Sequence, residues 1–250
     1  MRRTMSFAYG LLCYCVFLIA FLYAIGFVGD LLVPRTIDSG PQAGTATALA
    51  INLVLLGLFA VQHTVMARQG FKRTWTKVVP AHLERSTYVL AASLLLLLLY
   101  WQWRPMPEVI WDASPGAGTI SLWTLYGLGW FLVFIATFMI NHFDLFGLRQ
   151  IWIHAQGEEY RHPEFQTTAL YQHLRHPIML GFIIAFWATP HMSAGHLLFA
   201  VATTLYILAG IRFEEQDLMG FLGSDYRIYR QRVPMFVPFL KRGSSRTTEN

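Results

Sequence analysis

Long apolar runs alternate with short polar stretches along the whole chain. A helix needs about 20 apolar residues to cross a hydrocarbon core of about 30 Å, and a crossing segment must satisfy its own backbone hydrogen bonds. Several runs approach this length, which predicts an all-α polytopic transmembrane helical bundle of about six spans. The predicted spans are residues 7–32, 46–66, 87–103, 120–140, 178–190 and 194–213.

The composition supports a lipid environment. Of the 250 residues, 55% are hydrophobic and only 13% are charged, and the mean hydropathy is +0.42. A soluble domain of this composition could not cover its surface with polar groups, so the lipid bilayer is the predicted partner. The formal charge of +5 follows from basic loops between spans and does not indicate nucleic-acid binding.

The basic residues predict the orientation in the membrane. They crowd the connection between the second and third spans, whereas the connections at 35–44 and 104–119 carry few positive charges. Positive loops face the cytoplasm, so both termini, the connection at 141–176 and the segment after 212 should face it too. The crowded connection holds Arg68, Lys72, Arg73, Lys77 and Arg85.

One membrane domain over residues 1–242 is predicted, because no internal repeat or linker interrupts the chain. The connection at 189–195 is short enough to require a tight helical hairpin. An amphipathic segment after the last span should lie at the interface and fold back over this hairpin. Residues 243–250 are polar and should form a disordered tail. Cys13 and Cys15, the only cysteines, are predicted to be small apolar residues of the first span.

The candidate chemistry concentrates in residues 174–238, the predicted cofactor region. Pro177 suits the first turn of a helix, which places Arg175 and His176 at a positive helix N-terminus. Glu214 and Glu215 follow the last span. Because a hairpin joins the two spans, the cationic end and the acidic end should meet and face one pocket.

S-adenosyl-L-methionine needs this combination of groups. Its amino-acid carboxylate needs a cation, its ribose hydroxyls need acidic acceptors, and its adenine needs an apolar shelf. Arg175 and His176 can supply the first, and Glu214 or Glu215 the second. The predicted cofactor-binding residues are Arg175, His176, Pro177, Met179, Gly181, Glu214, Glu215, Tyr226 and Tyr229, with Phe182 as a further shelf residue.

Polar residues at the ends of spans two to four form a second group of candidates. Transfer of a methyl group from a sulfonium to a thiol is an in-line displacement, which needs a positioned acceptor and an excluded solvent. A thiol with a pKa of about 8.5 is mostly protonated at neutral pH, so a base would help. His142 or His63 could take the proton and Arg85 could stabilise the anion. The predicted catalytic residues are His63, Arg85, Asn141, His142 and Asp144.

Two sets of motifs resemble known membrane methyltransferases. Arg-His-Pro at 175–177, Trp187, Glu-Glu-x-x-Leu at 214–218 and Gly-x-x-Tyr-x-x-Tyr at 223–229 resemble the C-terminal cofactor region of the isoprenylcysteine carboxyl methyltransferase superfamily, which includes phospholipid methyltransferases. Met179 departs from that pattern, which often has an aromatic residue there. Upstream, the segments 61–68, 84–88, 101–105 and 141–147 are similar to the methanethiol S-methyltransferase and NnrU-like branch.

The resemblance implies an S-adenosylmethionine-dependent enzyme of the bacterial inner membrane that methylates a small thiol. The expected reaction converts methanethiol to dimethyl sulfide, and hydrogen sulfide is a further candidate acceptor. No obligate protein partner is evident. A lipid or prenyl-cysteine acceptor remains an alternative, since both could reach the pocket from the bilayer.

A haem- or metal-binding membrane protein of the NnrU-like type is the other alternative, because the chain has nine histidines. Haem would need axial histidines inside the bilayer. Here the histidines lie mainly at span ends and in loops, without a His-x-x-x-His or Cys-x-x-Cys-His pattern. Methyl transfer requires no metal, and none is predicted.

Each candidate also has a structural alternative. Arg175 and His176 could be a juxtamembrane basic pair, and Glu214 or Glu215 could pair with Arg212 at a solvated helix end. The 141–144 segment could be a polar helix terminus followed by a glycine cap. His63 and Arg85 could be satisfied by lipid headgroups or backbone.

Overall fold

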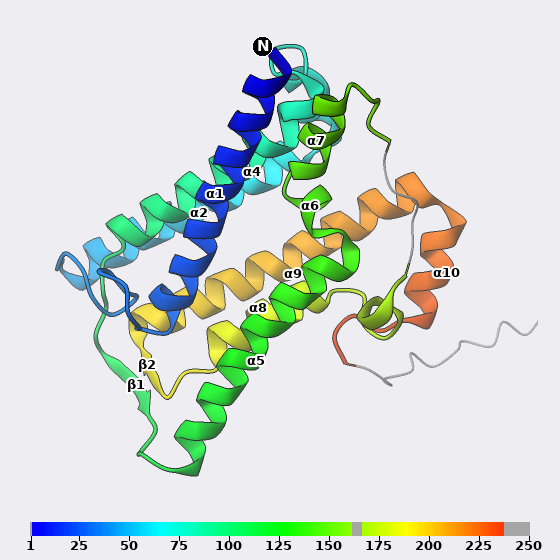
Figure 1. The fold of residues 1–250 in the computed structure, drawn as a ribbon. Coiled ribbons are helices and arrows are strands. Elements are labelled where there is room, and N and C mark those ends of the chain that lie inside the picture. The colour runs from blue at the N-terminus through cyan, green and yellow to red at the C-terminus, as the bar shows by residue number, and fades with distance from the viewer. Residues whose placement is uncertain (1, 162–166, 238–250) are drawn as a thin grey trace, which may run out of the picture.

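The computed structural model describes residues 2–161 and 167–237, and its long helices form a bundle (Figure 1). Five of the described helices are long and apolar enough to cross a membrane. The predicted polytopic helical bundle is therefore confirmed. These five helices are α1 (Arg2–Val28), α2 (Thr45–Ala67), α4 (Ala81–Gln102), α5 (Ala117–Ile140) and α9 (Ala194–Leu222).

The predicted span at 178–190 is shorter than expected. Helix α8 (Pro177–Trp187) has 11 residues, and a helix of that length covers about 16 Å, roughly half of the hydrocarbon core. Pro190 disfavours helix in the residue before it. The chain instead forms strand β2 (His191–Ser193), which pairs antiparallel with β1 (Val109–Asp112). The connection between α8 and α9 is thus anchored to a strand and is not a bare helical turn.

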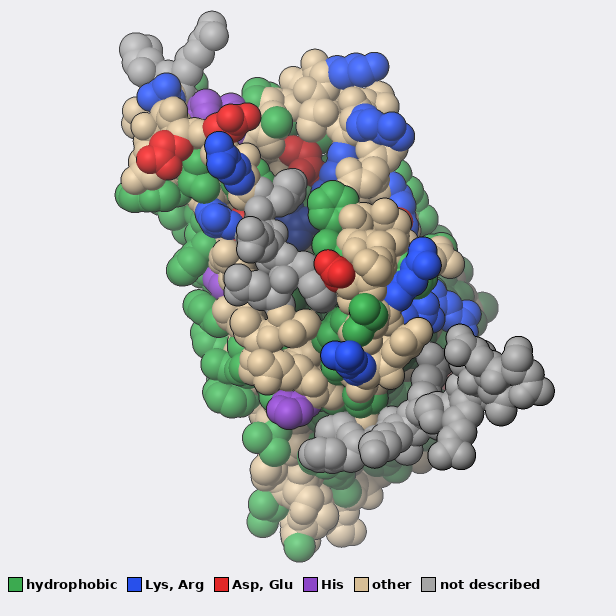
Figure 2. All heavy atoms as spheres, turned by 90° about the vertical axis from the view of Figure 1, so that its right-hand side faces the viewer, with side chains coloured by type: hydrophobic (Ala, Val, Ile, Leu, Met, Phe, Trp, Pro, Cys, Tyr) green, Lys and Arg blue, Asp and Glu red, His purple; other side chains and the backbone are tan. Residues whose placement is uncertain are grey.

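Short elements gather at the end of the bundle that holds the N-terminus. They are α3 (Gln69–Trp75), α6 (His142–Leu145), α7 (Leu148–Gln156), the 3-10 helix η1 (Ala169–Gln172) and α10 (Ser224–Arg232). Strands β1 and β2 lie at the opposite end (Figure 1). Figure 2 shows lysine and arginine side chains over the upper part of one face and none at its lower tip. We call the end with the N-terminus the basic end.

Helices α5 and α8 pack at very short distance because two glycines meet between them. A Cβ on Gly181 would lie 2.7 Å from the carbonyl oxygen of Gly129 and 2.9 Å from the backbone nitrogen of Val133. Small residues permit such close backbone approach between membrane helices. Gly181, predicted to contact the cofactor, therefore packs α8 against α5.

Helix α9 extends to Leu222 and does not end at 213 as predicted. Its last turns are rich in Glu, Gln, Leu and Met, which are good helix formers. It ends before Gly223, whose φ of 59° suits a residue without a side chain. After this turn α10 folds back, and the N–H of Arg175 donates to the carbonyl of Pro234 at 3.0 Å. The predicted tail at 243–250 lies outside the described residues.

Candidate active site

The start of α8 and the end of α9 meet at the basic end, as the hairpin argument predicted. The carboxylate of Glu215 lies at the centre of a buried ionic network. Its Oε1 is 2.8 Å from Nη2 of Arg175 and 3.2 Å from Nε2 of His176, and its Oε2 is 2.9 Å from Nε of Arg230. We call these four residues the Glu215 network.

Arg175 also ties α10 to α8. Its Nη1 donates to the carbonyl oxygens of Arg230 at 2.7 Å and Val233 at 2.9 Å. Its Nε is buried and makes no hydrogen bond within the described part of the chain. Nη1 of this guanidinium therefore holds the backbone of the site and Nη2 faces Glu215, whereas Nε can donate to a ligand.

Glu214 and Glu215 occupy different environments although they are adjacent. The side chain of Glu215 is 5% exposed, whereas that of Glu214 is 49% exposed. The closest cation to Glu214 is Nδ1 of His176, at 3.7 Å. Glu215 neutralises the buried Arg175 and the partly exposed Arg230, so Glu214 is the carboxylate that can accept hydrogen bonds from hydroxyl groups of a ligand.

Tyrosines of α10 lie beside this network. Tyr226 is almost fully buried, its ring centroid is 5.7 Å from that of Tyr229, and the Tyr229 hydroxyl donates to the carbonyl of Tyr171 at 2.7 Å. Burial raises the pKa of Tyr229 to about 12 and raises the pKa of Tyr226 as well. Both phenols are thus protonated at neutral pH. Met179, the third shelf candidate, packs against the hydrophobic core.

Pro177 occupies the first turn of α8, as predicted, and His176 precedes it. Arg230 is a member of the Glu215 network that the sequence interpretation missed. A signal was present, because Arg230 lies four residues after Tyr226 on α10 and so shares its helix face. Its charge alone did not distinguish it from the neighbouring arginines at 227 and 232.

The predicted catalytic residues fall into two groups. The first contains His63 and Arg85, which meet at Tyr88. The Tyr88 hydroxyl lies 2.9 Å from Nε2 and 3.0 Å from Nδ1 of His63, and Cζ of Arg85 lies 5.3 Å from the Tyr88 ring centroid. Arg85 interacts electrostatically with both His63 and Glu214. This group is therefore linked to the acidic pair.

The second group contains Asn141, His142 and Asp144. His142 bonds through Nε2 to the Tyr14 hydroxyl at 2.7 Å and through Nδ1 to the Thr137 hydroxyl at 2.8 Å. The Asn141 side chain accepts the N–H of Asp144 at 3.2 Å, and the Tyr160 hydroxyl donates to the Asp144 carboxylate at 2.8 Å. These bonds tie the group to α1, α5 and the chain after α7. A catalytic role for it stays a prediction.

His142 should make the protein sensitive to acid. Burial lowers its pKa below the ordinary 6.5, so the unfolded chain binds a proton below pH 6.5 that the folded protein rejects. Stability should fall as the pH drops through this window, by up to about 1.4 kcal/mol per unit. We expect the melting temperature of His142→Gln in detergent to fall less between pH 7 and pH 5 than that of the unchanged protein. Parallel curves would contradict this assignment.

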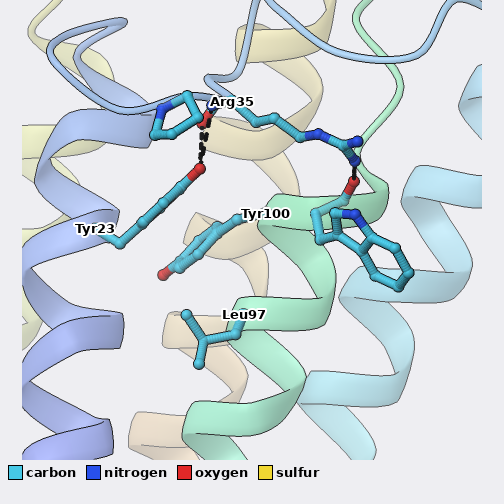
Figure 3. A pocket seen from close by; sticks show the side chains of 6 residues that line it. Tyr23, Arg35, Leu97 and Tyr100 are labelled. Atoms are coloured by element: carbon cyan, nitrogen blue, oxygen red, sulfur yellow. Dashed lines mark hydrogen bonds between the residues drawn. The ribbon is translucent and has the colours of Figure 1, made fainter.

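A cavity of about 200 Å³ between α1 and α4 (Figure 3) lies at the opposite end from the Glu215 network. The Tyr23 hydroxyl bonds to the backbone of Arg35 there, and Arg35 lies 5.9 Å over the Trp101 ring. This cavity does not include the predicted cofactor residues. The other lining residues are Pro34, Leu97 and Tyr100.

Comparisons with known proteins decide the family. No family model matches the chain, and no solved structure matches it. The methanethiol S-methyltransferase of Mycobacterium tuberculosis is 59% identical over 96% of this chain and 98% of its own length. The chain belongs to the methanethiol S-methyltransferase family. The methanethiol S-methyltransferase of Crocosphaera subtropica is 47% identical over 98% of this chain and 96% of its own length.

Membership in the methanethiol S-methyltransferase family confirms the predicted resemblance and the predicted enzyme class. Nurim of Mus musculus is more distant, at 34% identity over 68% of each chain. Within residues 2–161 and 167–237, no group of three or more His, Cys, Asp or Glu side chains is placed to hold a metal ion. The expected absence of a metal stays a prediction.

Proposed function

We propose that this protein transfers a methyl group from S-adenosyl-L-methionine to methanethiol, with dimethyl sulfide and S-adenosylhomocysteine as products. The observation that carries the proposal is the 59% identity to a methanethiol S-methyltransferase over nearly the whole chain. The site at the basic end supports it, because a cation and an exposed carboxylate stand side by side there. Hydrogen sulfide is a second acceptor of the same chemical class.

The residues present fit the proposed methyl donor. The buried Nε of Arg175 makes no hydrogen bond among the described residues, and a carboxylate is a suitable acceptor for it. Glu214 can accept the ribose hydroxyls, and Tyr229, which is partly exposed, offers apolar surface for adenine. When bound, this group supplies an electrophilic methyl on a positively charged sulfur.

The residues of the protein position the donor and stabilise the thiolate. The Glu215 network holds α8, α9 and α10 together and so positions the bound donor. Arg85 places a positive charge near the proposed acceptor site, which favours a thiolate. None of these steps uses a metal ion.

The proposed location is the bacterial inner membrane, with the basic end in the cytoplasm. Five long apolar helices support membrane insertion. The orientation rests on the positive-inside rule, because the loop from Arg68 to Arg85 holds five of the 19 lysines and arginines and α10 holds three more. This orientation would give the site access to cytoplasmic S-adenosylmethionine.

The decisive test is headspace gas chromatography of the purified protein in detergent, supplied with S-adenosylmethionine and methanethiol. We expect dimethyl sulfide from the unchanged protein. Glu214→Gln should weaken S-adenosylmethionine binding about tenfold or more, because its partly exposed carboxylate loses charge-assisted hydrogen bonds. Calorimetry with S-adenosylmethionine measures that affinity.

Glu108→Gln is the matched control, since Glu108 precedes β1 at the opposite end of the bundle. It should leave product formation and donor affinity unchanged. Donor binding without dimethyl sulfide would point to the lipid or prenyl-cysteine acceptor. A protein that binds no donor and shows a haem absorbance band would contradict the proposal.

A further inference from the structure

We propose that His63 takes the proton from the acceptor thiol and that Tyr88 is the positioning residue for its imidazole. This inference rests on the proposed function and names the base for it. The imidazole lies among aromatic side chains. Its nitrogens are 2.9 Å and 3.0 Å from the Tyr88 hydroxyl, and its ring stacks on Phe59 with centroids 5.1 Å apart.

The geometry distinguishes His63 from His142, the other predicted base. Both nitrogens of His142 already bond to separate hydroxyl groups, from Tyr14 and Thr137. A proton from a substrate could reach His142 only if one of these bonds broke. Both nitrogens of His63 share a single hydroxyl partner, so one nitrogen can bond to Tyr88 while the other receives a proton.

The remaining described histidines that could compete are engaged elsewhere. His176 belongs to the Glu215 network. His82 bonds to Ser6 and stacks on the ring of His154 near the N-terminus. His196 bonds to the carbonyl of Phe186 near the β-strand end of the bundle. Unlike these histidines, His63 faces Tyr88 and belongs to no ion pair of Glu214 or Glu215.

Helices α2 and α9 place His63 deeper than the acidic pair. They run side by side in the same direction, because Thr64 bonds to Tyr206 at 3.2 Å and Arg68 pairs with Asp217 at 3.0 Å. Glu214 lies two helical turns beyond Tyr206, which corresponds to roughly 12 Å along the axis. A donor held by Glu214 at the surface would therefore have His63 on its membrane side.

Arg85 lies between the His63 site and the acidic pair. Its guanidinium lies over the Tyr88 ring and interacts electrostatically with His63 and with Glu214. Its Nε donates to the carbonyl of Leu145 at 2.7 Å, which fixes its position. A neighbouring positive charge favours the thiolate that forms when the acceptor loses its proton.

The proposed step balances in atoms and charge. A ring nitrogen of His63 accepts the S–H proton, and the resulting thiolate attacks the methyl carbon of the sulfonium. A new carbon–sulfur bond forms to the acceptor, while the old bond to the donor sulfur breaks and its electron pair stays on that sulfur. The proton then leaves His63 for solvent, so the net reaction releases one proton.

The test combines kinetics with a measurement on the histidine itself. We expect His63→Gln to lower kcat about 100-fold, in the range of general-base catalysis. The affinity for S-adenosylmethionine, measured by calorimetry, should stay unchanged. Its remaining rate should rise with pH as the free thiol ionises. Tyr88→Phe should lower kcat about tenfold and shift the acid limb of the pH profile. In ¹⁵N-histidine spectra, Tyr88→Phe should also move the ring signals that His63→Gln removes.

Tyr9→Phe is the matched control, because Tyr9 bonds to Thr87, the neighbour of Tyr88, at 3.0 Å. This substitution removes one hydroxyl of α1 that contacts α4. It should leave kcat, the pH profile and the His63 signals unchanged. An unaltered kcat and an unaltered acid limb in His63→Gln would overturn this inference. The proposed function would still stand if the unchanged protein formed dimethyl sulfide. An absence of product from the unchanged protein would instead contradict the proposed function.

Discussion

Replacing Glu215 with alanine is expected to destabilise the protein by about 3–5 kcal/mol and to abolish methyl transfer. The substitution leaves Arg175 and Arg230 without the carboxylate that lies 2.8 Å and 2.9 Å from them. Uncompensated buried charge is costly, and this loss is large beside a total stability of about 5–15 kcal/mol. A chain of this size should melt roughly 10 °C lower, measured by thermal unfolding in detergent.

Glu214→Ala is the matched comparison, because it removes the same group one residue away. The Glu214 side chain is 49% exposed and its closest cation is 3.7 Å distant, so its stability should change by less than about 1 kcal/mol. Donor binding should be lost in both variants, with folding kept only in Glu214→Ala. Equal melting temperatures for the two variants would show that Glu215 does not hold α8, α9 and α10 together.

The second large effect is expected from Gly181→Ala. The added methyl would lie 2.7 Å from the Gly129 oxygen and 2.8 Å from a Val133 methyl. Backbone cannot move aside as a flexible side chain can, so α5 and α8 must separate. Overpacking of this kind costs about 1–3 kcal/mol. Thermal unfolding should show the loss, and donor affinity should fall too, because α8 carries Arg175 and His176 at its start.

Gly210→Ala provides the control within α9. A Cβ at Gly210 meets no atom within 4 Å, and alanine favours helix over glycine by about 1 kcal/mol. This variant should therefore be as stable as the unchanged protein or slightly more stable. If the Gly181→Ala and Gly210→Ala variants had the same melting temperature, the contact between α5 and α8 would tolerate a methyl group.

These contrasts assign separate tasks to neighbouring residues of the motif. Arg175 and Arg230 both lie against the Glu215 carboxylate, and Arg175 also donates to backbone carbonyls of Arg230 and Val233, so these residues hold the ends of α8, α9 and α10 together. Glu214 and Nε of Arg175, which makes no hydrogen bond in the described part of the chain, are the groups proposed to bind the ligand. A loss of activity after Arg175→Ala would therefore combine lost packing with lost binding, and Glu214 is the better residue for testing the cofactor site alone.

The sequence alone determined the membrane bundle, the meeting of Arg175 and His176 with the acidic pair, and the family. Each depends on features that can be read along the chain, such as the length, apolarity and order of its segments. Helix crossing needs only length and apolarity, and the meeting at the basic end follows from the order of the last two apolar segments. The ends of helices were less certain, because α9 continues through Glu214 and Glu215 and α8 stops at Trp187.

Only the tertiary structure separated side chains that look alike in the sequence. Adjacent Glu214 and Glu215 look alike in the sequence, and burial on one face of α9 separates them. His63 and His142 look equally suited to take a proton, but their hydroxyl partners come from helices that are distant in the chain. Arg230 and Tyr88 gained their importance in the same way, since a side chain's protonation and freedom to act depend on neighbours that linear spacing does not reveal.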